Sequence, residues 1–318
     1  MKIKNGFFLI HKNMAIRIFF IIIAAIALCL PHGASDRCHA GEEKNAPDTF
    51  ILWALSDIQP KNITHRWHLE KAIEDINKNI PEVYAAVVAG DIVHHRESKE
   101  DFLWYLEAKK KSNVPYWFEI AGNHDMKDEK HYREYIGNNL HYSVTVGNIL
   151  MLFMSDEDRF PAQKISDSTF RWWKNKVEKN RDRIIITITH AYLKESQLFG
   201  SLVPSRNISD SERFAEVLKK NRISLWICGH THLPGFIWER YTNISALKGV
   251  TFINVSAIRK SFFNDIESNL VYFYNGKDTA KILRRNHEKG KFVHTLGSAI
   301  KLQRPFRWDG GPPKVELD

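Results

Sequence analysis

Two histidines, His230 and His232, follow a short apolar run and one glycine, Gly229. The run, residues 224–228, is typical of a buried strand, and side chains two positions apart on an extended chain point the same way. Neutral imidazoles are common metal ligands, so this spacing could hold a transition-metal ion. A polar loop also explains a single His-x-His pair, and the metal hypothesis therefore needs support from elsewhere in the chain.

Four other apolar runs end in residues of the same chemical kind. Carboxylate, amide and imidazole groups come directly after them: Asp57 and Gln59 after 50–56, Asp91 after 84–89, Asn123 and His124 after 116–121, and His190 after 184–189. Strands of an α/β sheet present their carboxyl ends along one edge, so we expect these side chains to meet there. Mixed oxygen and nitrogen ligands favour divalent Mn, Fe or Zn over Ca or a thiolate site.

Taken together, the motifs Asp-x-Gln, Gly-Asp, Gly-Asn-His-Asp, His and Gly-His-Thr-His resemble those of the calcineurin-like metallophosphoesterase superfamily, over roughly residues 50–260. The resemblance implies two divalent metal ions, with Mn preferred and Fe, Zn or Mg as alternatives. It assigns the ligands in three groups: Asp57, Gln59 and His232 to one ion, Asn123, His190 and His230 to the other, and Asp91 as a bridge between them.

This ligand set implies hydrolysis of a phosphate ester. Two cations about 3.5–4 Å apart lower the pKa of a bridging water and clamp the attacking and leaving oxygens of a displacement at phosphorus. The resemblance therefore implies cleavage of a phosphodiester or pyrophosphate-type nucleotide bond by a metal-bridging hydroxide. A phosphomonoesterase is one alternative, and a non-catalytic binding module that keeps the fold is another. His124 is implied as the catalytic residue that protonates the leaving oxygen, or else as a supporting hydrogen-bond donor.

Gln59 departs from the pattern, because most of the superfamily has histidine at this position. A glutamine oxygen is a weaker and harder ligand than imidazole, which favours Mn²⁺ or Mg²⁺ over Zn²⁺ at the first metal position. Members with Asp-x-Gln include ones similar to the Mn-dependent ADP-ribose/CDP-alcohol pyrophosphatases, which favours a diester or pyrophosphate substrate over a simple monoester. A structural Gln59 that contacts no metal is the alternative.

Five further residues are candidates for contact with the substrate. His95 and Arg96 follow the predicted bridging Asp, and we expect one of them to contact the phosphate unless both are solvated loop residues. Trp67 could stack on a base, with packing in the core as the alternative. Tyr192 and Arg206 border residues 191–209, which lack periodicity and could form a lid or a wall of the substrate site.

Residues 1–40 differ in composition from the rest of the chain. Basic residues precede an unbroken apolar run, 18–30, and a small-residue cleavage site lies before Gly41. This pattern is typical of an export signal, so we expect a periplasmic or extracellular protein. The alternative is an uncleaved membrane anchor formed by 18–30, which is the only membrane association that we expect. Met14 could be the true start.

Composition and charge are ordinary for one globular domain, which we place at 41–318. The 318 residues are 43% hydrophobic and 26% charged. Residues 1–40 hold five basic side chains and one acidic one, so the remainder keeps +5 of the net charge of +9. That excess favours a small anionic phosphate ester, but no clustered Arg/Lys stripe indicates nucleic acid, which disfavours a nuclease. Cys228 would be the lone cysteine after removal of the signal and is expected in the core.

Apolar runs of strand type alternate with helical periodicity from residue 49 onward. We expect helices over 62–80, 128–136, 167–180 and 210–221, then strands alone over 235–240, 250–256, 269–275 and 279–284. Such an α/β pattern predicts a mixed sheet with a second sheet packed on it. The resemblance implies a four-layer α-β-β-α sandwich, with two mixed sheets face to face, helices outside and the metal site at strand carboxyl ends. A Gly- and Pro-rich tail from about residue 305 is expected to be loosely held.

Overall fold

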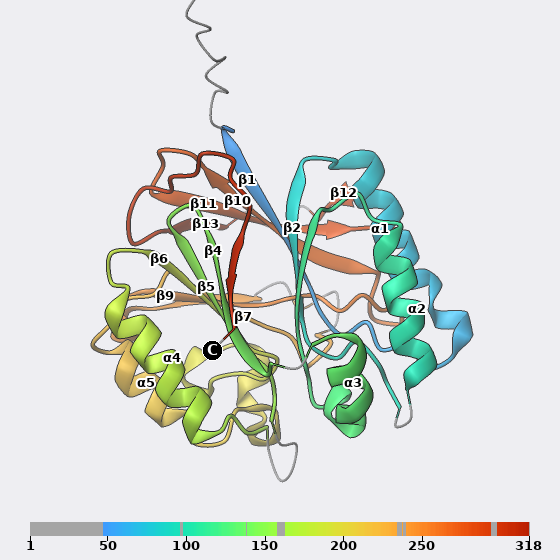
Figure 1. Ribbon diagram of the computed structural model, residues 1–318, viewed down its shortest axis with the longest axis horizontal. Helices are drawn as coiled ribbons and strands as arrows, with labels where there is room; N and C mark the ends of the chain where they lie inside the picture. Colours follow the sequence, from blue (N-terminus) through green and yellow to red (C-terminus); the bar gives the residue numbers. More distant parts are fainter. Residues whose placement is uncertain are drawn as a thin grey trace, which may run out of the picture. The chain divides into compact units, whose positions relative to one another are not determined.

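Two mixed β-sheets lie face to face at the centre of the unit that Asn45–Asp318 forms (Figure 1). The computed structural model describes residues 47–95, 98–137, 139–157, 163–233, 237, 240–293 and 298–317. The expected export signal or anchor in residues 1–40 lies outside these ranges. Within them, no helix combines the length and the apolar composition that a membrane crossing requires.

The first sheet has the strand order β12-β11-β10-β1-β2-β3 in the described part of the chain, and β13 pairs with β11. Its strands are β1 (Thr49–Leu55), β2 (Val83–Ala89), β3 (Tyr116–Ile120), β10 (Glu267–Tyr274), β11 (Thr279–Asn286), β12 (Lys291–Phe292) and β13 (Ser298–Lys301). β1, β2 and β3 are parallel, whereas β10 is antiparallel to β1. The carboxyl ends of these three parallel strands therefore meet at one edge.

The second sheet has the order β14-β4-β5-β6-β7-β9-β8 among the described residues. Its strands are β4 (His141–Val146), β5 (Ile149–Met154), β6 (Ile184–Ile188), β7 (Leu225–Cys228), β8 (Tyr241–Ile244), β9 (Val250–Asn254) and β14 (Lys314–Glu316). β5, β6, β7 and β9 run parallel. Their long apolar runs agree with burial on both faces, which parallel sheets require.

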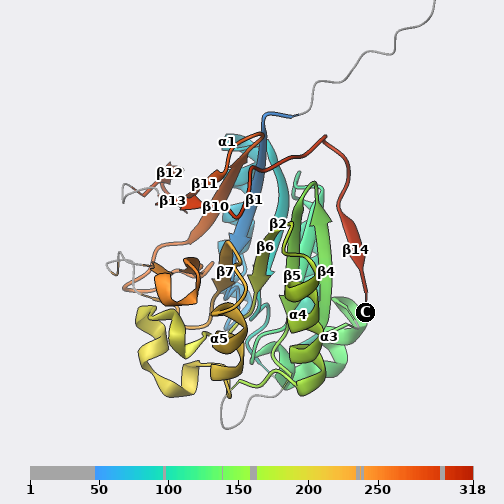
Figure 2. The same cartoon turned by 90° about the vertical axis from the view of Figure 1, so that its left-hand side faces the viewer.

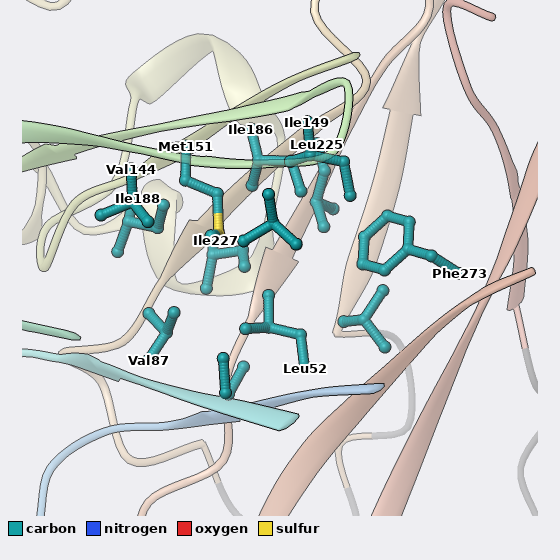
Figure 3. Packing of buried hydrophobic residues seen from close by; sticks show 14 of the residues in the cluster. Leu52, Val87, Val144, Ile149, Met151, Ile186, Ile188, Leu225, Ile227 and Phe273 are labelled. Carbon is teal, nitrogen blue, oxygen red and sulfur yellow. The ribbon is translucent and has the colours of Figure 1, made fainter. Parts of the chain in front are cut away.

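Helices cover the outer face of each sheet (Figure 1). α1 (Trp67–Asn79), α2 (Lys99–Lys110) and α3 (Glu129–Tyr135) lie on the first sheet, and α4 (Asp167–Lys179) and α5 (Glu212–Leu218) on the second. In β1, Trp53 faces the helices, while Leu52 faces the second sheet and meets Val87, Met151 and Ile227 in the central core (Figure 3). The expected four-layer sandwich is confirmed.

Helix positions agree with the periodicity, with local differences at the ends. The first expected helix begins as a separate 3-10 turn, Ile63–His65, because the side chain of Asn62 accepts a hydrogen bond from the Thr64 N–H at 3.0 Å. At α4, Ser166 Oγ accepts from the Thr169 N–H at 3.3 Å, as expected of its N-cap. Most of the expected strand 235–240 lies outside the described residues.

The end of the chain differs from the expected loosely held tail. Phe306 and Trp308 are buried in the core between the sheets, and the Trp308 ring centroid lies 5.5 Å from that of Phe50. β14 then pairs antiparallel with β4, beside which it lies in Figure 2. The Gly and Pro residues agree with the scarcity of helix and strand in this segment. Two buried aromatic side chains and the backbone hydrogen bonds between β14 and β4 nevertheless hold it in place.

Candidate metal centre

The predicted ligands all lie just beyond the carboxyl ends of parallel strands. Asp57 and Gln59 follow β1, Asp91 follows β2, Asn123 follows β3, His190 follows β6, and His230 and His232 follow β7. Backbone hydrogen bonds tie the first two loops together, from the Asp57 N–H to Gly90 O at 3.1 Å and from the Gln59 N–H to Asp91 O at 3.2 Å. The sheet edge therefore gathers ligands from both sheets at one place.

Several of these residues have unusual backbone conformations. The φ angle is 54° at Asp57, 57° at Asp91, 80° at His230 and 44° at His232. Positive φ costs free energy in residues other than glycine, and such strain is concentrated at functional sites. The surrounding strands hold these turns in place, which directs the side chains toward one another.

Five side chains converge as two overlapping groups of three. Ligand atoms of Asp91, His190 and His230 lie within 4.8 Å of one another, and so do those of Asp57, Asp91 and His232. Asp91 belongs to both groups. A carboxylate has two oxygens that can face two cations, so this arrangement fits the predicted pair of metal positions.

Hydrogen bonds orient the individual ligands. His190 Nε2 lies 3.2 Å from Asp91 Oδ2 and 3.0 Å from His230 Nδ1. His232 Nε2 lies 2.8 Å from Asp57 Oδ1, while Asp57 Oδ2 accepts the His230 N–H at 2.9 Å. The His124 N–H donates to Asp91 Oδ1 at 2.8 Å. Each carboxylate is thus held by a backbone N–H group and faces an imidazole, both from the loop after β7 for Asp57 and from the loops after β3 and β6 for Asp91.

The two amide side chains differ in how they fit a cation. Asn123 Oδ1 is buried and has no hydrogen-bond partner within the described ranges, which is the state expected of an oxygen that binds an ion. Gln59 Nε2 instead donates to Asp91 Oδ2, and Gln59 Oε1 lies 3.4 Å from Arg259 Nη1. Rotation of the amide exchanges its oxygen and nitrogen. Metal binding by Gln59 therefore stays a prediction.

Two glycines permit the close approach of these groups. A Cβ built at Gly122 would lie in contact with Asp91 Oδ1 and 2.7 Å from the Asp91 backbone nitrogen. A Cβ at Gly90, where φ is +84°, would lie 2.7 Å from His190 Nδ1. Both contacts are closer than real Cβ atoms make, so glycine is required at both positions.

Burial and charge shift the protonation of the central pair. Burial alone would raise the pKa of Asp91, but the facing imidazole of His190 lowers it below its usual range. Burial alone would lower the pKa of His190, yet Asp91 and Asp57 raise it well above 6.5. A cation bound between these groups would displace the proton from His190, because imidazole coordinates a metal in its neutral form.

The pKa values of two further imidazoles of the site, His230 and His124, are lowered. Burial and the charge of His190 lower the pKa of His230 to about 3. Burial also lowers the pKa of His124. Neutral His230 is ready to bind a cation without losing a proton, as a metal ligand must be.

A buried carboxyl group connects two of the ligand loops. Asp125 accepts hydrogen bonds from the backbone N–H groups of Ile92 at 2.8 Å, Val93 at 3.0 Å and Gly122 at 2.8 Å. Burial, followed by the charge of Asp91, raises the pKa of Asp125 to about 8. Asp125 thus ties the loop after β2 to the loop after β3.

A pocket of about 280 Å³ opens onto these groups. It is lined by Gln59, Lys61, Asp91, His94, Asn123, His124, Arg206, His230, Thr231, His232 and Arg259. His124 Nδ1 lies 2.7 Å from the carbonyl oxygen of His94. Lys127 Nζ lies 2.8 Å from the same nitrogen, so one contact needs a proton on Nδ1 and the other needs its lone pair. Together the two contacts hold the ring in place beside the pocket.

Of the four predicted substrate contacts that the structure describes, only Arg206 lines this pocket. Tyr192 is fully buried, and its hydroxyl bonds to Thr231 Oγ1. His95 is exposed with Nε2 3.0 Å from Lys61 O, and Trp67 begins α1 with its ring 5.9 Å from Lys260 Nζ. Arg96 lies outside the described residues.

Sequence reasoning missed Lys61, Thr231 and Arg259 as lining residues and considered His95 where His94 reaches the pocket. The signal for Arg259 was present, because it lies five residues beyond the end of β9, another parallel strand. Residues 191–209 form three short 3-10 helices, Lys194–Ser196, Phe199–Leu202 and Pro204–Arg206, of which the last supplies Arg206.

Comparison with known proteins identifies the family and the fold. The sequence profile of the calcineurin-like phosphoesterase family matches residues 51–234. Comparison with curated protein sequences gives no significant match.

Two solved structures share the fold. GAP50, described as the anchor in the inner membrane complex of Plasmodium, superposes with a TM-score of 0.56 at 14% identity, covering 82% of this chain and 90% of that chain. Purple acid phosphatase PPD1 from yellow lupin (Lupinus luteus) seeds gives a TM-score of 0.55 at 11% identity, covering 80% of this chain and 54% of that chain. At these identities the likeness establishes the architecture alone.

Proposed function

The chain belongs to the calcineurin-like phosphoesterase family, and from this premise we propose that it is an exported hydrolase that cleaves phosphate-ester bonds with the help of two divalent metal ions. The observation that carries the proposal is the position of Asp91 in two ligand groups at once. One group contains His190 and His230, and the other contains Asp57 and His232. A site for a single ion would not need a carboxylate shared in this way.

The chemistry of the donors supports this choice of cofactor. Two carboxylates, two amides and three imidazoles form a mixed oxygen and nitrogen set that suits Mn²⁺, with Fe, Zn or Mg as alternatives. When bound, such a pair of ions lowers the pKa of a water molecule and stabilises negative charge at phosphorus. Asn123 would hold one ion through its unpartnered Oδ1. Gln59 would complete the other set after rotation of its amide.

His124 is the residue that we propose for proton transfer. Its ring lines the pocket, and His94 O and Lys127 Nζ both contact Nδ1, so we assign Nε2 as the atom that exchanges a proton with substrate. Burial lowers the pKa of His124, but the negative charge of a bound phosphate would raise it again. A proton on Nε2 could then pass to the leaving oxygen.

The finer proposal concerns the substrate and the location. Small phosphate esters fit a pocket of about 280 Å³ that includes the cationic side chains of Lys61 and Arg206. We propose a phosphodiester or pyrophosphate-type nucleotide, with a phosphomonoester as the alternative. Export rests on the basic and apolar pattern of residues 1–40, which is typical of a signal.

The test compares metal content and turnover in the same preparation. The full chain is stripped with a chelator and reloaded with Mn²⁺, and then supplied with bis-(p-nitrophenyl) phosphate, p-nitrophenyl phosphate or a nucleotide pyrophosphate. Asp91→Asn serves as the diagnostic variant. Asp182→Asn removes an exposed carboxylate that precedes β6, at the opposite end of this strand from His190, and serves as the matched control.

We expect two bound ions and turnover in the parent protein and in Asp182→Asn. Asp91→Asn should no longer bind the pair of metal ions. Its activity should fall by more than the roughly 10- to 100-fold that is typical when a residue supporting a metal ligand is removed. Two bound ions without turnover of any substrate would instead support the non-catalytic binding module. Absence of bound metal under saturating Mn²⁺ would refute the proposal.

A further inference from the structure

Arg259 reaches the metal centre from a part of the chain that the family profile does not match, since the profile ends at residue 234. Ala257 pairs with Ser56 as an isolated parallel bridge, and the Ile258 N–H donates to Ser56 O at 3.0 Å. Ser56 immediately precedes Asp57. The segment after β9 is therefore fixed beside the loop after β1, and this connection places Arg259 in the pocket.

The guanidinium of Arg259 lies against two predicted ligands of the first metal position. Its Nη1 is 3.4 Å from Gln59 Oε1 and 3.4 Å from His232 Nδ1. Neither partner is a carboxylate. No ion pair joins Arg259 to a carboxylate in the described part of the chain, in contrast to Arg285, whose Nε lies 2.5 Å from Asp75 Oδ2. The positive charge of Arg259 is thus available for a ligand.

Arg206 occupies the matching position at the other metal. Its Nη1 lies 3.5 Å from His230 Nε2, and it too has no ion pair among the described residues. Arg206 and Arg259 are here called the arginine pair. Each lies beside a different ligand group, and both line the same pocket. Lys61 adds a third cationic side chain to the lining.

We propose that the arginine pair binds the phosphoryl oxygens of the substrate and makes the site selective for phosphate groups that carry two negative charges. This inference rests on the proposed function. Guanidinium groups donate hydrogen bonds in a fixed fork that matches phosphate oxygens and remain charged at all relevant pH values. Arg259 would contact the oxygens nearest the first metal position, and Arg206 those nearest the second.

Charge balance explains the selectivity. Asp57 and Asp91 offset only part of the charge of two divalent ions, and the arginine pair and Lys61 add three more positive charges. A phosphodiester brings one negative charge and leaves this excess in a partly enclosed site, where charges interact more strongly than in water. A terminal phosphate or a pyrophosphate linkage brings two negative charges. Among the substrates named in the proposed function, the arginine pair therefore favours the pyrophosphate-type nucleotide and the phosphomonoester over the phosphodiester.

The experiment measures binding separately from turnover. Inorganic phosphate, which is mainly dianionic at mildly alkaline pH, and dimethyl phosphate, a monoanion, are titrated calorimetrically into the Mn²⁺-loaded full chain. The variants are Arg259→Gln and Arg259→Lys. Arg171→Gln, which removes a charge from an exposed position on α4, is the matched control. Metal content and thermal unfolding are recorded for each protein.

We expect Arg259→Gln to lower the affinity for inorganic phosphate by about tenfold or more, because hydrogen bonds to a charged group are lost. The affinity for dimethyl phosphate should fall by less than about threefold, because this monoanion has fewer charged oxygens for Arg259 to contact. Arg259→Lys should retain part of the affinity, and Arg171→Gln all of it. Equal weakening of both probes by Arg259→Gln, or an unchanged phosphate affinity with normal metal content, would overturn the inference.

Turnover then distinguishes the two sources of a dianionic group and separates this inference from the proposed function. Rates with p-nitrophenyl phosphate and inorganic pyrophosphate decide between a monoester and a pyrophosphate linkage, and both should exceed the rate with bis-(p-nitrophenyl) phosphate. A preference for the diester that Arg259→Gln leaves intact would contradict the inference while leaving a phosphoesterase. Tight, Arg259-dependent phosphate binding without any hydrolysis would contradict the proposed function alone.

Discussion

His190 Nδ1 lies 2.8 Å from the carbonyl oxygen of Ala89, a residue 101 positions earlier in the chain. Because a carbonyl only accepts, Nδ1 carries a proton, and Nε2 is the atom left to face Asp91 and bind a cation. One hydrogen bond between the two sheets thus determines how His190 enters the site. Metal-binding histidines commonly depend on such a partner, and its loss typically costs 10- to 100-fold in metal affinity.

The first prediction tests this contact through the neighbouring glycine. Gly90→Ala would place a Cβ 2.7 Å from His190 Nδ1 at a φ of +84°, so we expect the ring to shift and Mn²⁺ affinity to fall about 10- to 100-fold. Titration of Mn²⁺ into chelator-stripped protein measures the change. Gly137→Ala is the control, since a Cβ there meets nothing within 4 Å. Equal affinities in the two variants would contradict the assignment of His190.

The second prediction concerns proton transfer by His124. We expect His124→Asn to lower kcat by about 10²- to 10⁴-fold for substrates with an alkoxide leaving group. The loss should be much smaller for p-nitrophenyl esters, because nitrophenolate leaves without a proton. The ratio of the two losses, measured at constant metal content, is the readout. A uniform loss for both classes would show that His124 orients the substrate and does not supply a proton.

The third prediction concerns acid stability. His68 is 4% exposed, and burial, followed by the charges of His65, Arg259 and Lys260 against that of Glu288, lowers its pKa from 6.5 to about 4. The unfolded chain binds this proton more readily, so the contribution to stability is complete above pH 6.5 and is lost as the pH falls toward 4. One proton corresponds to about 1.4 kcal/mol per pH unit.

Urea unfolding of the metal-stripped protein at several pH values in that window measures the slope. His68→Gln should reduce the slope by about one proton, because its amide does not titrate. An identical pH dependence in the variant would mean that His68 becomes protonated without cost in the folded protein.

The fourth prediction tests the fixed end of the chain. Trp308 is 6% exposed, and its ring centroid lies 4.6 Å from that of Tyr84. Trp308→Ala should lower the free energy of unfolding by about 3–5 kcal/mol, as expected when a buried large aromatic is removed. Leu317→Ala, at a side chain that is 68% exposed, should change it by less than about 0.5 kcal/mol. If the tail were loosely held, the two variants would have equal free energies of unfolding.

Much of the ligand arrangement could be predicted from the sequence because it depends on local geometry. Strands that are buried on both faces appear as continuous apolar runs, and the polar residue after each run lies at the sheet edge whatever the rest of the fold does. That reasoning brought Asp57, Asp91 and His190 to one edge, and the structure groups all three there. Whether each binds an ion stays a prediction.

Contacts between segments that are distant in the sequence were decided by tertiary structure. Asp57 faces His232 across 175 positions, and Arg259 enters the pocket only because Ala257 pairs with Ser56 at the junction of the two sheets. Tyr192 lies two residues after the predicted ligand His190, yet its ring is fully buried and does not line the pocket. The spacing of apolar residues along the sequence does not indicate such contacts between distant segments.

The sequence by itself determined the order of strands and helices, the chemical types of the ligands and their common edge, because backbone direction and side-chain alternation fix these locally. Only the tertiary structure decided which cationic side chains line the pocket, how Gln59 is oriented, and that β14 pairs with β4. These depend on how two twisted sheets pack, which is a property of the whole core and not of any one segment.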